Sequence, residues 1–308
     1  MKRILTIFAL LVMMAANAGA EEKSMSYRFG DIKSVTIGQS YSVFFEIHVT
    51  KGNSKVVSII YDTELEKEIK DFEKYLKVSY SEPGETLTLG MYDLPRKFGK
   101  LRLPLKTAPV KVYVEMDEIH EISLCGASSI YFDGSFTADE FEADLSGASK
   151  FGNTLHIDGK SLSLDCSGAA KVAVEGNFKH VDIDMSGAAS GSFNGNADEL
   201  ECDLSGAAKL LCKGEYDRCE MECSGAVSLE LHGKGKTLNL EGSGACKLDA
   251  KEYNAKAAYV ELSGACSAKV QASDELKHDV STASKLTYYG QAKVTDMSRN
   301  RNVVQGTM

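Results

Sequence analysis

The sequence predicts an all-β chain whose second half is a parallel β-helix. Three observations predict this fold: a recurring tripeptide, a second recurring glycine, and strands in which apolar and polar residues alternate. The tripeptide Ser-Gly-Ala, or a close variant, occurs nine times, and its central residues are 21, 21, 19, 19, 19, 19, 20 and 18 positions apart. A period near twenty over so many copies is typical of a solenoid in which each repeat forms one coil. The central residues are Gly126, Gly147, Gly168, Gly187, Gly206, Gly225, Gly244, Gly264 and Thr282.

A glycine follows the central residue of the tripeptide by eight positions in six of the coils. Glycine adopts positive φ at no steric cost, so two glycine stations per period predict two corners per coil. Between the corners, apolar residues occupy every second position, as in Leu162, Leu164 and Cys166, which predicts half-buried strands. Each strand should pair with its copy in the next coil, about 4.8 Å away. The repeats span residues 119–290, and their uneven period favours a right-handed coil.

Residues 27–118 lack the tripeptide but also read as strands. Alternating apolar residues in 43–49 lead through a turn into 56–61, and a second hairpin pattern spans 76–91. Between them, residues 62–76 predict one amphipathic helix with Leu65, Ile69, Phe72 and Leu76 on one side. We expect this helix to cap or flank the open coil, because solenoid ends must be covered. The polar tail, 295–308, should fray.

The first twenty residues predict a secretory signal peptide. Lys2 and Arg3 precede an apolar run, and a small-residue pattern, Ala18-Gly19-Ala20, ends it. No cysteine lies near the predicted cleavage point, so we expect no lipid anchor, and no later stretch is long and apolar enough for a membrane span. The predicted location is therefore outside the cytoplasm: the periplasm, the cell surface or the medium. Without Lys2 and Arg3, the chain has 33 basic and 44 acidic residues, a net charge of −11. This charge argues against nucleic acid as a partner.

The usual catalytic motifs are missing from the sequence. Six histidines are scattered without a His-Glu-x-x-His pattern, and there is no Gly-x-Ser-x-Gly or Gly-x-x-x-x-Gly-Lys motif. A polysaccharide lyase or hydrolase is the enzymatic alternative, since many right-handed β-helices degrade acidic polysaccharides. Such a lyase needs a basic residue beside clustered aspartates, but residues 119–290 contain a single arginine, Arg218, and evenly spaced carboxylates. We therefore predict no enzymatic activity and no cofactor.

Eight cysteines in an exported chain would normally suggest a disulfide framework. Most of them instead fall at inward apolar positions and should be buried thiols that pack as small hydrophobic groups. Cys246 and Cys266 differ, because they occupy the same station in adjacent coils. Their Cα atoms should lie about 5 Å apart, which is within disulfide range. We predict that this pair forms the disulfide of the chain.

One outward column carries a carboxylate in each of eight coils, just before the Ser-Gly-Ala corner. Like charges that face each other on neighbouring strands repel, and lysines beyond the corner compensate only in part. Two interpretations are open: a solvated face that prevents aggregation, or a ladder that binds cations or a basic partner. The column, our candidate partner-binding face, consists of Asp144, Asp165, Asp184, Asp203, Glu222, Glu241, Glu261 and Asp279.

The repeated string Leu-x-Ser-Gly-Ala-x-Lys resembles that of a known family. Residues 144–150 (Asp-Leu-Ser-Gly-Ala-Ser-Lys) and 203–209 (Asp-Leu-Ser-Gly-Ala-Ala-Lys) are similar to the typical string of the head GIN domain family, a group of auto-transporter adhesin heads common in Bacteroidetes. The resemblance covers residues 27 to about 294 and implies a β-helical, surface-associated, adhesive protein without catalytic or metal-binding residues. A solenoid offers the same chemical group about every 4.8 Å, which suits a repeating ligand, so the partner we expect is a glycan, a matrix protein or an envelope protein. A structural envelope protein without a ligand is the alternative.

Overall fold

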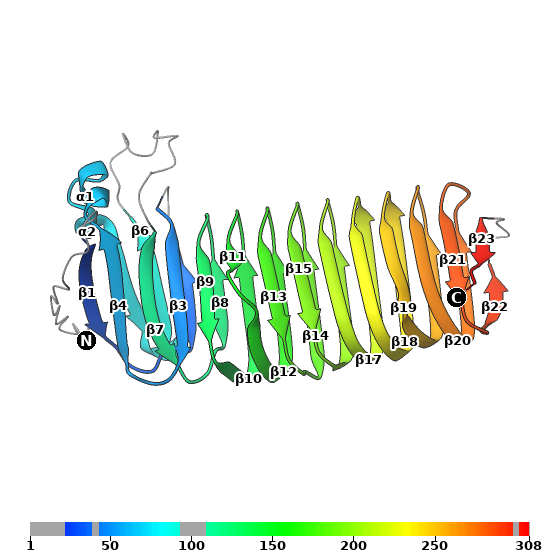
Figure 1. Cartoon of the computed structure of the whole chain (residues 1–308), viewed down its shortest axis with the longest axis horizontal. Coiled ribbons are helices and arrows are strands. Elements are labelled where there is room, and N and C mark those ends of the chain that lie inside the picture. Colours follow the sequence, from blue (N-terminus) through cyan, green and yellow to red (C-terminus); the bar gives the residue numbers. More distant parts are fainter. Residues whose placement is uncertain (1–21, 39–42, 93–108, 298–301, 308) are drawn as a thin grey trace. The chain divides into compact units, whose positions relative to one another are not determined.

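The computed structural model describes residues 22–38, 43–92, 109–297 and 302–307 (Figure 1). The described residues are almost entirely β, with 68% of them in strands, and form a β-solenoid of about ten turns. The predicted fold class is therefore confirmed. The predicted signal peptide lies outside the described residues. The chain divides into two compact units, residues 1–137 with 146–155 (unit 1) and residues 138–145 with 156–308 (unit 2).

Unit 1 contains two ladders of strands. In one ladder, β4 pairs antiparallel with β1 on one side and with β7 on the other. The strands β7, β3, β9 and β11 then pair in parallel, in that order. In the other ladder, β5 pairs antiparallel with β6, and β6, β2 and β8 are parallel. The bounds are β1 Glu22–Arg28, β2 Ser34–Ile37, β3 Phe45–Lys51, β4 Val56–Asp62, β5 Leu76–Ser81, β6 Thr86–Met91, β7 Val110–Met116, β8 Glu121–Leu124, β9 Ser129–Asp133 and β11 Lys150–Phe151.

The strands predicted over residues 43–49, 56–61 and 76–91 form in unit 1 as β3, β4, β5 and β6, but one pairing differs. The second predicted hairpin forms, with β5 and β6 joined by the 3₁₀ turn η1, Glu82–Gly84. The strands β3 and β4 do not pair with each other, although only a short turn separates them. Instead, β7 pairs with both, in parallel with β3 and antiparallel to β4. Alternation shows which side of a strand is buried, but it does not identify the strand's neighbour.

The single helix predicted over residues 62–76 is wrong in extent. Two short helices replace it, α1 (Glu64–Glu68) and α2 (Phe72–Tyr75). The chain leaves helical geometry between them, because Asp71 adopts a left-handed conformation with φ of 60°. Aspartate tolerates this conformation better than most residues. The apolar side is nevertheless buried as predicted: Leu65, Ile69, Phe72 and Leu76 are all at most 7% exposed.

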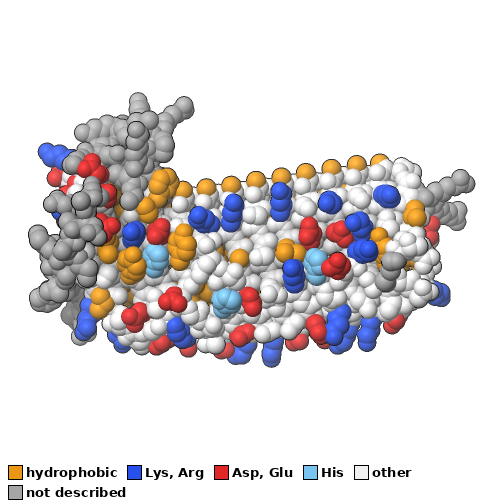
Figure 2. Space-filling view, in the orientation of Figure 1, with side chains coloured by type: hydrophobic (Ala, Val, Ile, Leu, Met, Phe, Trp, Pro, Cys, Tyr) orange, Lys and Arg blue, Asp and Glu red, His pale blue; other side chains and the backbone are white. Residues whose placement is uncertain are grey.

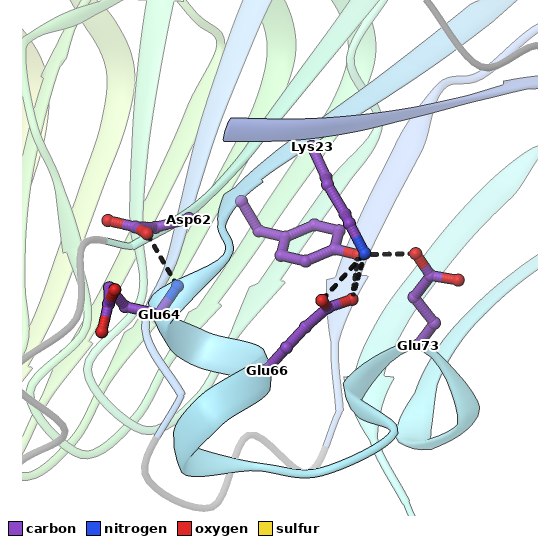
Figure 3. A network of polar contacts seen from close by, with 6 residues as sticks. Lys23, Asp62, Glu64, Glu66 and Glu73 are labelled. Carbon is purple, nitrogen blue, oxygen red and sulfur yellow. Dashed lines mark hydrogen bonds and ion pairs between the residues drawn. The ribbon is translucent and has the colours of Figure 1, made fainter. Parts of the chain in front are cut away.

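A polar network fastens both helices to the strands beside them (Figure 3). Tyr61, on β4, is buried, and its hydroxyl lies 3.0 Å from a Glu66 oxygen of α1 and 2.5 Å from a Glu73 oxygen of α2. Lys23, on β1, donates to both oxygens of Glu66 at 2.8 Å. Burial is the main cause that raises the pKa of Tyr61 above its ordinary value, and the two carboxylates add to it. The tyrosine therefore stays protonated and able to donate.

Unit 2 is built from coils whose strands pair in parallel with their copies. One ladder runs through β10, β12, β14, β16, β17, β18, β19, β20 and β22, and the other through β13, β15, β17, β18, β19, β20, β21 and β23. The bounds are β10 Ser135–Leu145, β12 Leu155–Cys166, β13 Lys171–Glu175, β14 His180–Met185, β15 Ser190–Asn194, β16 Ala197–Leu204, β17 Lys209–Gly225, β18 Ser228–Gly244, β19 Lys247–Leu262, β20 Ser267–Val280, β21 Lys285–Tyr289, β22 Lys293–Asp296 and β23 Val303–Gln305.

The inward side chains of unit 2 form continuous columns. Leu164, Ile183, Cys202, Met221 and Leu240 are neighbours in successive strands, and each is at most 3% exposed. Burying an apolar side chain of this size contributes about 1.5–3 kcal/mol. The alternation therefore correctly predicts both the strands and their buried side.

The Ser-Gly-Ala corners stack on one another as predicted. Gly187 and Gly206 both have φ of 71°, and the amide of Ala207 donates to the carbonyl oxygen of Gly187 at 2.7 Å. The amide of Ala188 donates in the same way to Gly168 at 2.6 Å. The left-handed conformation at each corner thus directs the next amide toward the coil before it.

The second corner depends on close approach between backbones. A Cβ atom at Gly195 would lie 1.7 Å from the carbonyl oxygen of Gly176, so no larger residue fits. Beside these glycines, Asn177 and Asn196 form an amide ladder: the Nδ2 atom of Asn196 donates to the Oδ1 atom of Asn177 at 3.0 Å. Stacked asparagines of this kind stabilise the corner in register.

The variation in the length of the repeat is accommodated at one part of the coil. Between β19 and β20 the pairing passes from Ala250 directly to Asn254, so three residues of β19 have no register partner in β20. A similar irregularity follows Glu230 in β18. Close to the Ser-Gly-Ala corner, by contrast, Glu241 pairs with Glu261 and Glu261 with Asp279 without interruption.

Candidate binding groove

The predicted column of carboxylates forms on unit 2. Asp165, Asp184, Asp203 and Glu222 are direct neighbours in four successive strands, and Glu241, Glu261 and Asp279 continue the column in register. Asp144 is close enough for the charge of Asp165 to raise its pKa, after the larger effect of burial. These side chains are exposed, apart from the half-buried Asp144. All eight predicted residues are therefore brought together.

The column forms one wall of a groove that runs along the coils. The groove has a volume of about 440 Å³, and the serines of the Ser-Gly-Ala corners form its other polar wall. We call it the acidic groove. Its polar lining consists of Asp165, Asp184, Asp203, Glu222, Glu241 and Glu261 with Ser186, Ser205, Ser224, Ser243 and Ser263.

Crowding of like charges raises the pKa of carboxyl groups in the acidic groove. For Glu222, the charges of Asp203 and Glu241 are the main cause. For Asp184, partial burial is the largest cause, and the charges of Asp182, Asp203 and Asp165 add to it. A positively charged ligand would relieve this repulsion, so the groove is electrostatically prepared for a cationic group.

The family assignment follows from the repeat and from comparison with known proteins. A family model described as "Putative auto-transporter adhesin, head GIN domain" matches residues 40–196 and 188–292. The chain belongs to this family. The resemblance seen in the Ser-Gly-Ala strings is thereby confirmed, and the two matched segments together span most of the chain. A comparison with curated proteins found no match.

Several solved structures are similar to this GIN-domain chain. A putative adhesin from Parabacteroides merdae is 14% identical with a TM-score of 0.52, and the match covers 93% of this chain and 96% of that one. A putative adhesin from Parabacteroides distasonis is 12% identical with a TM-score of 0.46, covering 93% and 97%. A putative lipid binding protein from the same species is 13% identical with a TM-score of 0.44, covering 93% and 97%. Because its sequence identity is only 14%, the Parabacteroides merdae structure supports the fold and nothing further.

The GIN-domain repeat holds a second acidic row that our sequence analysis missed. Asp182, Glu201 and Glu220 are direct neighbours on β14, β16 and β17, and each lies two residues before a carboxylate of the groove. Burial, followed by the charge of Asp203, raises the pKa of Asp182. This row could have been predicted from the sequence, because side chains two residues apart in a strand point to the same side of the sheet. The negative face is thus wider than one column.

The lysines beyond the corner do not neutralise the groove. Lys171, Lys209, Lys247 and Lys285 follow the corner, whereas the carboxylates precede it, and their side chains are exposed. In Figure 2, Lys and Arg side chains lie along the coils of unit 2 beside a line of small hydrophobic side chains. Within the part of the chain that the structure describes, no ion pair joins these lysines to carboxylates of the acidic groove. The groove therefore keeps its negative charge.

Cys246 and Cys266 occupy the same station immediately before β19 and β20, because the residues that follow them, Lys247 and Ser267, pair directly. Both are buried free thiols in the structure. Burial raises the pKa of the Cys246 thiol, and the neighbouring Cys266 adds to the effect. Their disulfide stays a prediction. The other cysteines are buried as expected, apart from the half-buried Cys125.

Two structural features bear on possible ligands. Among the described residues, no group of three or more His, Cys, Asp or Glu side chains is arranged to hold a metal ion. The carboxylates of the acidic groove therefore stand as a row and not as a coordination cage. In the described ranges no helix is long and apolar enough to cross a membrane.

Proposed function

We propose that this GIN-domain chain is an exported, non-catalytic adhesion module that binds a basic partner along its acidic groove. One observation carries the proposal: six carboxylates line a single groove at strand spacing, and among the described residues no lysine forms an ion pair with any of them. The family, described as adhesin heads, supports the adhesive role. At the N-terminus, Lys2 and Arg3 precede an apolar run, and this pattern supports export to the periplasm, the cell surface or the medium.

The repeat itself determines which kind of partner suits the groove. Successive carboxylates lie about 4.8 Å apart, so a chain that carries positive groups at a regular interval can contact several coils at once. Each exposed ion pair is weak, about 0.2–1 kcal/mol, and becomes useful only when many form together. A cationic glycan or a lysine-rich matrix or envelope protein has this character.

Binding by arrays is the direct test. The mature chain is applied to a glycan and matrix-protein array that includes chitosan oligomers, with and without calcium. The four-amide variant, Asp165→Asn, Asp184→Asn, Asp203→Asn and Glu222→Gln, removes the negative charge of four neighbouring coils. We expect it to lose most of its affinity for basic partners, because the summed contacts disappear while the outward side of the strands keeps its shape.

A matched control separates the groove from net charge. The charge-control variant converts four exposed carboxylates elsewhere on unit 2 to their amides: Glu140, Asp198, Glu230 and Asp274. It changes the net charge by the same amount and should bind as tightly as wild type. If the four-amide variant binds every positive spot as tightly as wild type, the acidic face is only a solvated surface. Binding that depends wholly on calcium would also count against direct recognition of a cationic group.

A further inference from the structure

Lysines and serines alternate in a column along unit 2, beyond the Ser-Gly-Ala corner from the acidic groove. Each member lies three residues after the central residue of a tripeptide, whereas each groove carboxylate lies three residues before it. The register makes each member the direct neighbour of the next, in strands β13, β15, β17, β18, β19, β20 and β21. We call it the lysine–serine column. It consists of Lys171, Ser190, Lys209, Ser228, Lys247, Ser267 and Lys285.

The lysines of this column are exposed, and their charge is not used within the chain. In the ranges that the structure describes, no ion pair includes any of them. Asp249 lies two residues from Lys247 on β19, but its carboxylate pairs with Lys269, whose Nζ atom is 2.8 Å away. The column is therefore a positive surface on a chain that is acidic as a whole.

Low side chains border the first part of the column. Toward the corner stands the exposed alanine of each tripeptide, and Figure 2 shows such a line of small hydrophobic side chains beside a line of Lys and Arg. On the other side, Ala173, Ser192 and Leu211 are direct neighbours on β13, β15 and β17. Glu230 and Asp249 continue this second row. An extended molecule can thus lie on the first lysines without a carboxylate beside it.

The alternation sets the distance between positive charges. Neighbouring strands are about 4.8 Å apart, so successive lysines stand about 9.6 Å apart, and the four together span about 29 Å. An acidic β-strand presents its same-side carboxylates about 6.7 Å apart, and duplex DNA carries one charge about every 1.7 Å, so neither matches this interval. Two sugar units of an extended polysaccharide have about the required length.

We propose that the lysine–serine column binds an extended acidic polysaccharide that carries one carboxylate in each disaccharide. Each carboxylate then meets one ammonium group, and the sugar hydroxyls between them face serine hydroxyls, which both donate and accept hydrogen bonds. A polymer with a carboxylate on every sugar brings twice the charge, and the half that faces no lysine is repelled by the acidic chain. The column lies across the corner from the acidic groove and has the opposite charge, so this site goes beyond the proposed function.

Biolayer interferometry tests the inference with the mature chain and an immobilised hyaluronan octasaccharide, which offers one carboxylate for each lysine of the column. We expect binding at low ionic strength that weakens as salt is added, because exposed ion pairs are screened. Lys209→Gln with Lys247→Gln should weaken binding about fivefold, since two exposed ion pairs are lost. Ser190→Ala with Ser228→Ala should weaken it about threefold through lost hydrogen bonds to sugar hydroxyls.

A matched control separates the column from general charge. Lys179→Gln with Lys256→Gln removes two exposed lysines of unit 2 that lie outside the column, and it should bind like wild type. A thermal melt checks that every variant keeps the fold. The inference is overturned by absence of hyaluronan binding, by equal losses in the two lysine variants, or by unchanged binding of Lys209→Gln with Lys247→Gln. Tighter binding of polygalacturonate, which has a carboxylate on every sugar, would refute the match in spacing. Loss of binding in the four-amide variant would assign the polysaccharide to the acidic groove instead.

Discussion

Replacing Gly206 with alanine tests whether the stacked corners hold the coils together. Gly206 has φ of 71°, which an L-residue adopts at a cost of about 1–2 kcal/mol. A Cβ atom there would also lie 2.7 Å from the carbonyl oxygen of Gly187 and 3.0 Å from its amide nitrogen. Both contacts are with backbone, so the stacked corner must shift.

The expected loss of stability combines three effects. Forcing a methyl group into a packed place costs about 1–3 kcal/mol. Alanine reduces the freedom of the unfolded chain relative to glycine, which returns about 0.4–1 kcal/mol. With the left-handed backbone included, we expect Gly206→Ala to lower the free energy of unfolding by about 1–5 kcal/mol.

Urea unfolding followed by far-UV circular dichroism measures this loss. Gly191→Ala is the matched control, because the atoms nearest to its Cβ are side-chain atoms of Met185 and Val172 at 3.2 Å, which can adjust. We expect the control to stay within about 1 kcal/mol of wild type. If Gly206→Ala is as stable as Gly191→Ala, the corners do not carry the stability that their geometry implies.

The remaining predictions concern protons, thiols and catalysis. Because the pKa values of Asp184 and Glu222 are raised in the folded chain, the folded state binds more protons than the unfolded state as the pH falls toward about 4. Wild type should therefore gain stability relative to the four-amide variant between pH 7 and about pH 4, and a constant difference between their melting temperatures would contradict this reasoning. Alkylation under denaturing conditions and mass spectrometry of the exported protein should reveal one bridge, Cys246–Cys266, and six free thiols; four bridges would refute the assignment. A screen of purified uronic-acid polymers should release no product, and release that an outward point substitution abolishes would reveal an enzyme.

The sequence carries most of the information on unit 2, because each coil repeats the same local pattern. Alternation such as Leu162, Leu164 and Cys166 indicates which side chains are buried, and the fixed period places each strand beside its copy. The carboxylate column follows directly from these two facts. The second acidic row, with Asp182 and Glu201, follows from the same alternation. It is harder to recognise in the sequence because it recurs less regularly than the first column.

Unit 1 was harder to predict because it does not repeat. Its strands are recognisable one by one, yet the insertion of β7 between β3 and β4 depends on pairing between residues far apart in sequence. The break at Asp71 is a local backbone conformation that a helical apolar pattern conceals. The stacked rings of Tyr113, His48 and Tyr131 have no sequence signature for the same reason, because they meet only through long-range register.

One part of the coil is suited to change in length, because residues 251–253 of β19 have no register partner in β20 and Lys251 has none in β18 either. Residues 251–253 lie outside the register with β20, whereas the carboxylate column continues in step on both sides of them. Lys251 and Glu252 are at least partly exposed. Natural insertions should therefore accumulate between these two residues, where they lengthen a coil without altering the spacing of the groove. The same position offers an engineer a place to graft a peptide and display it on the solenoid.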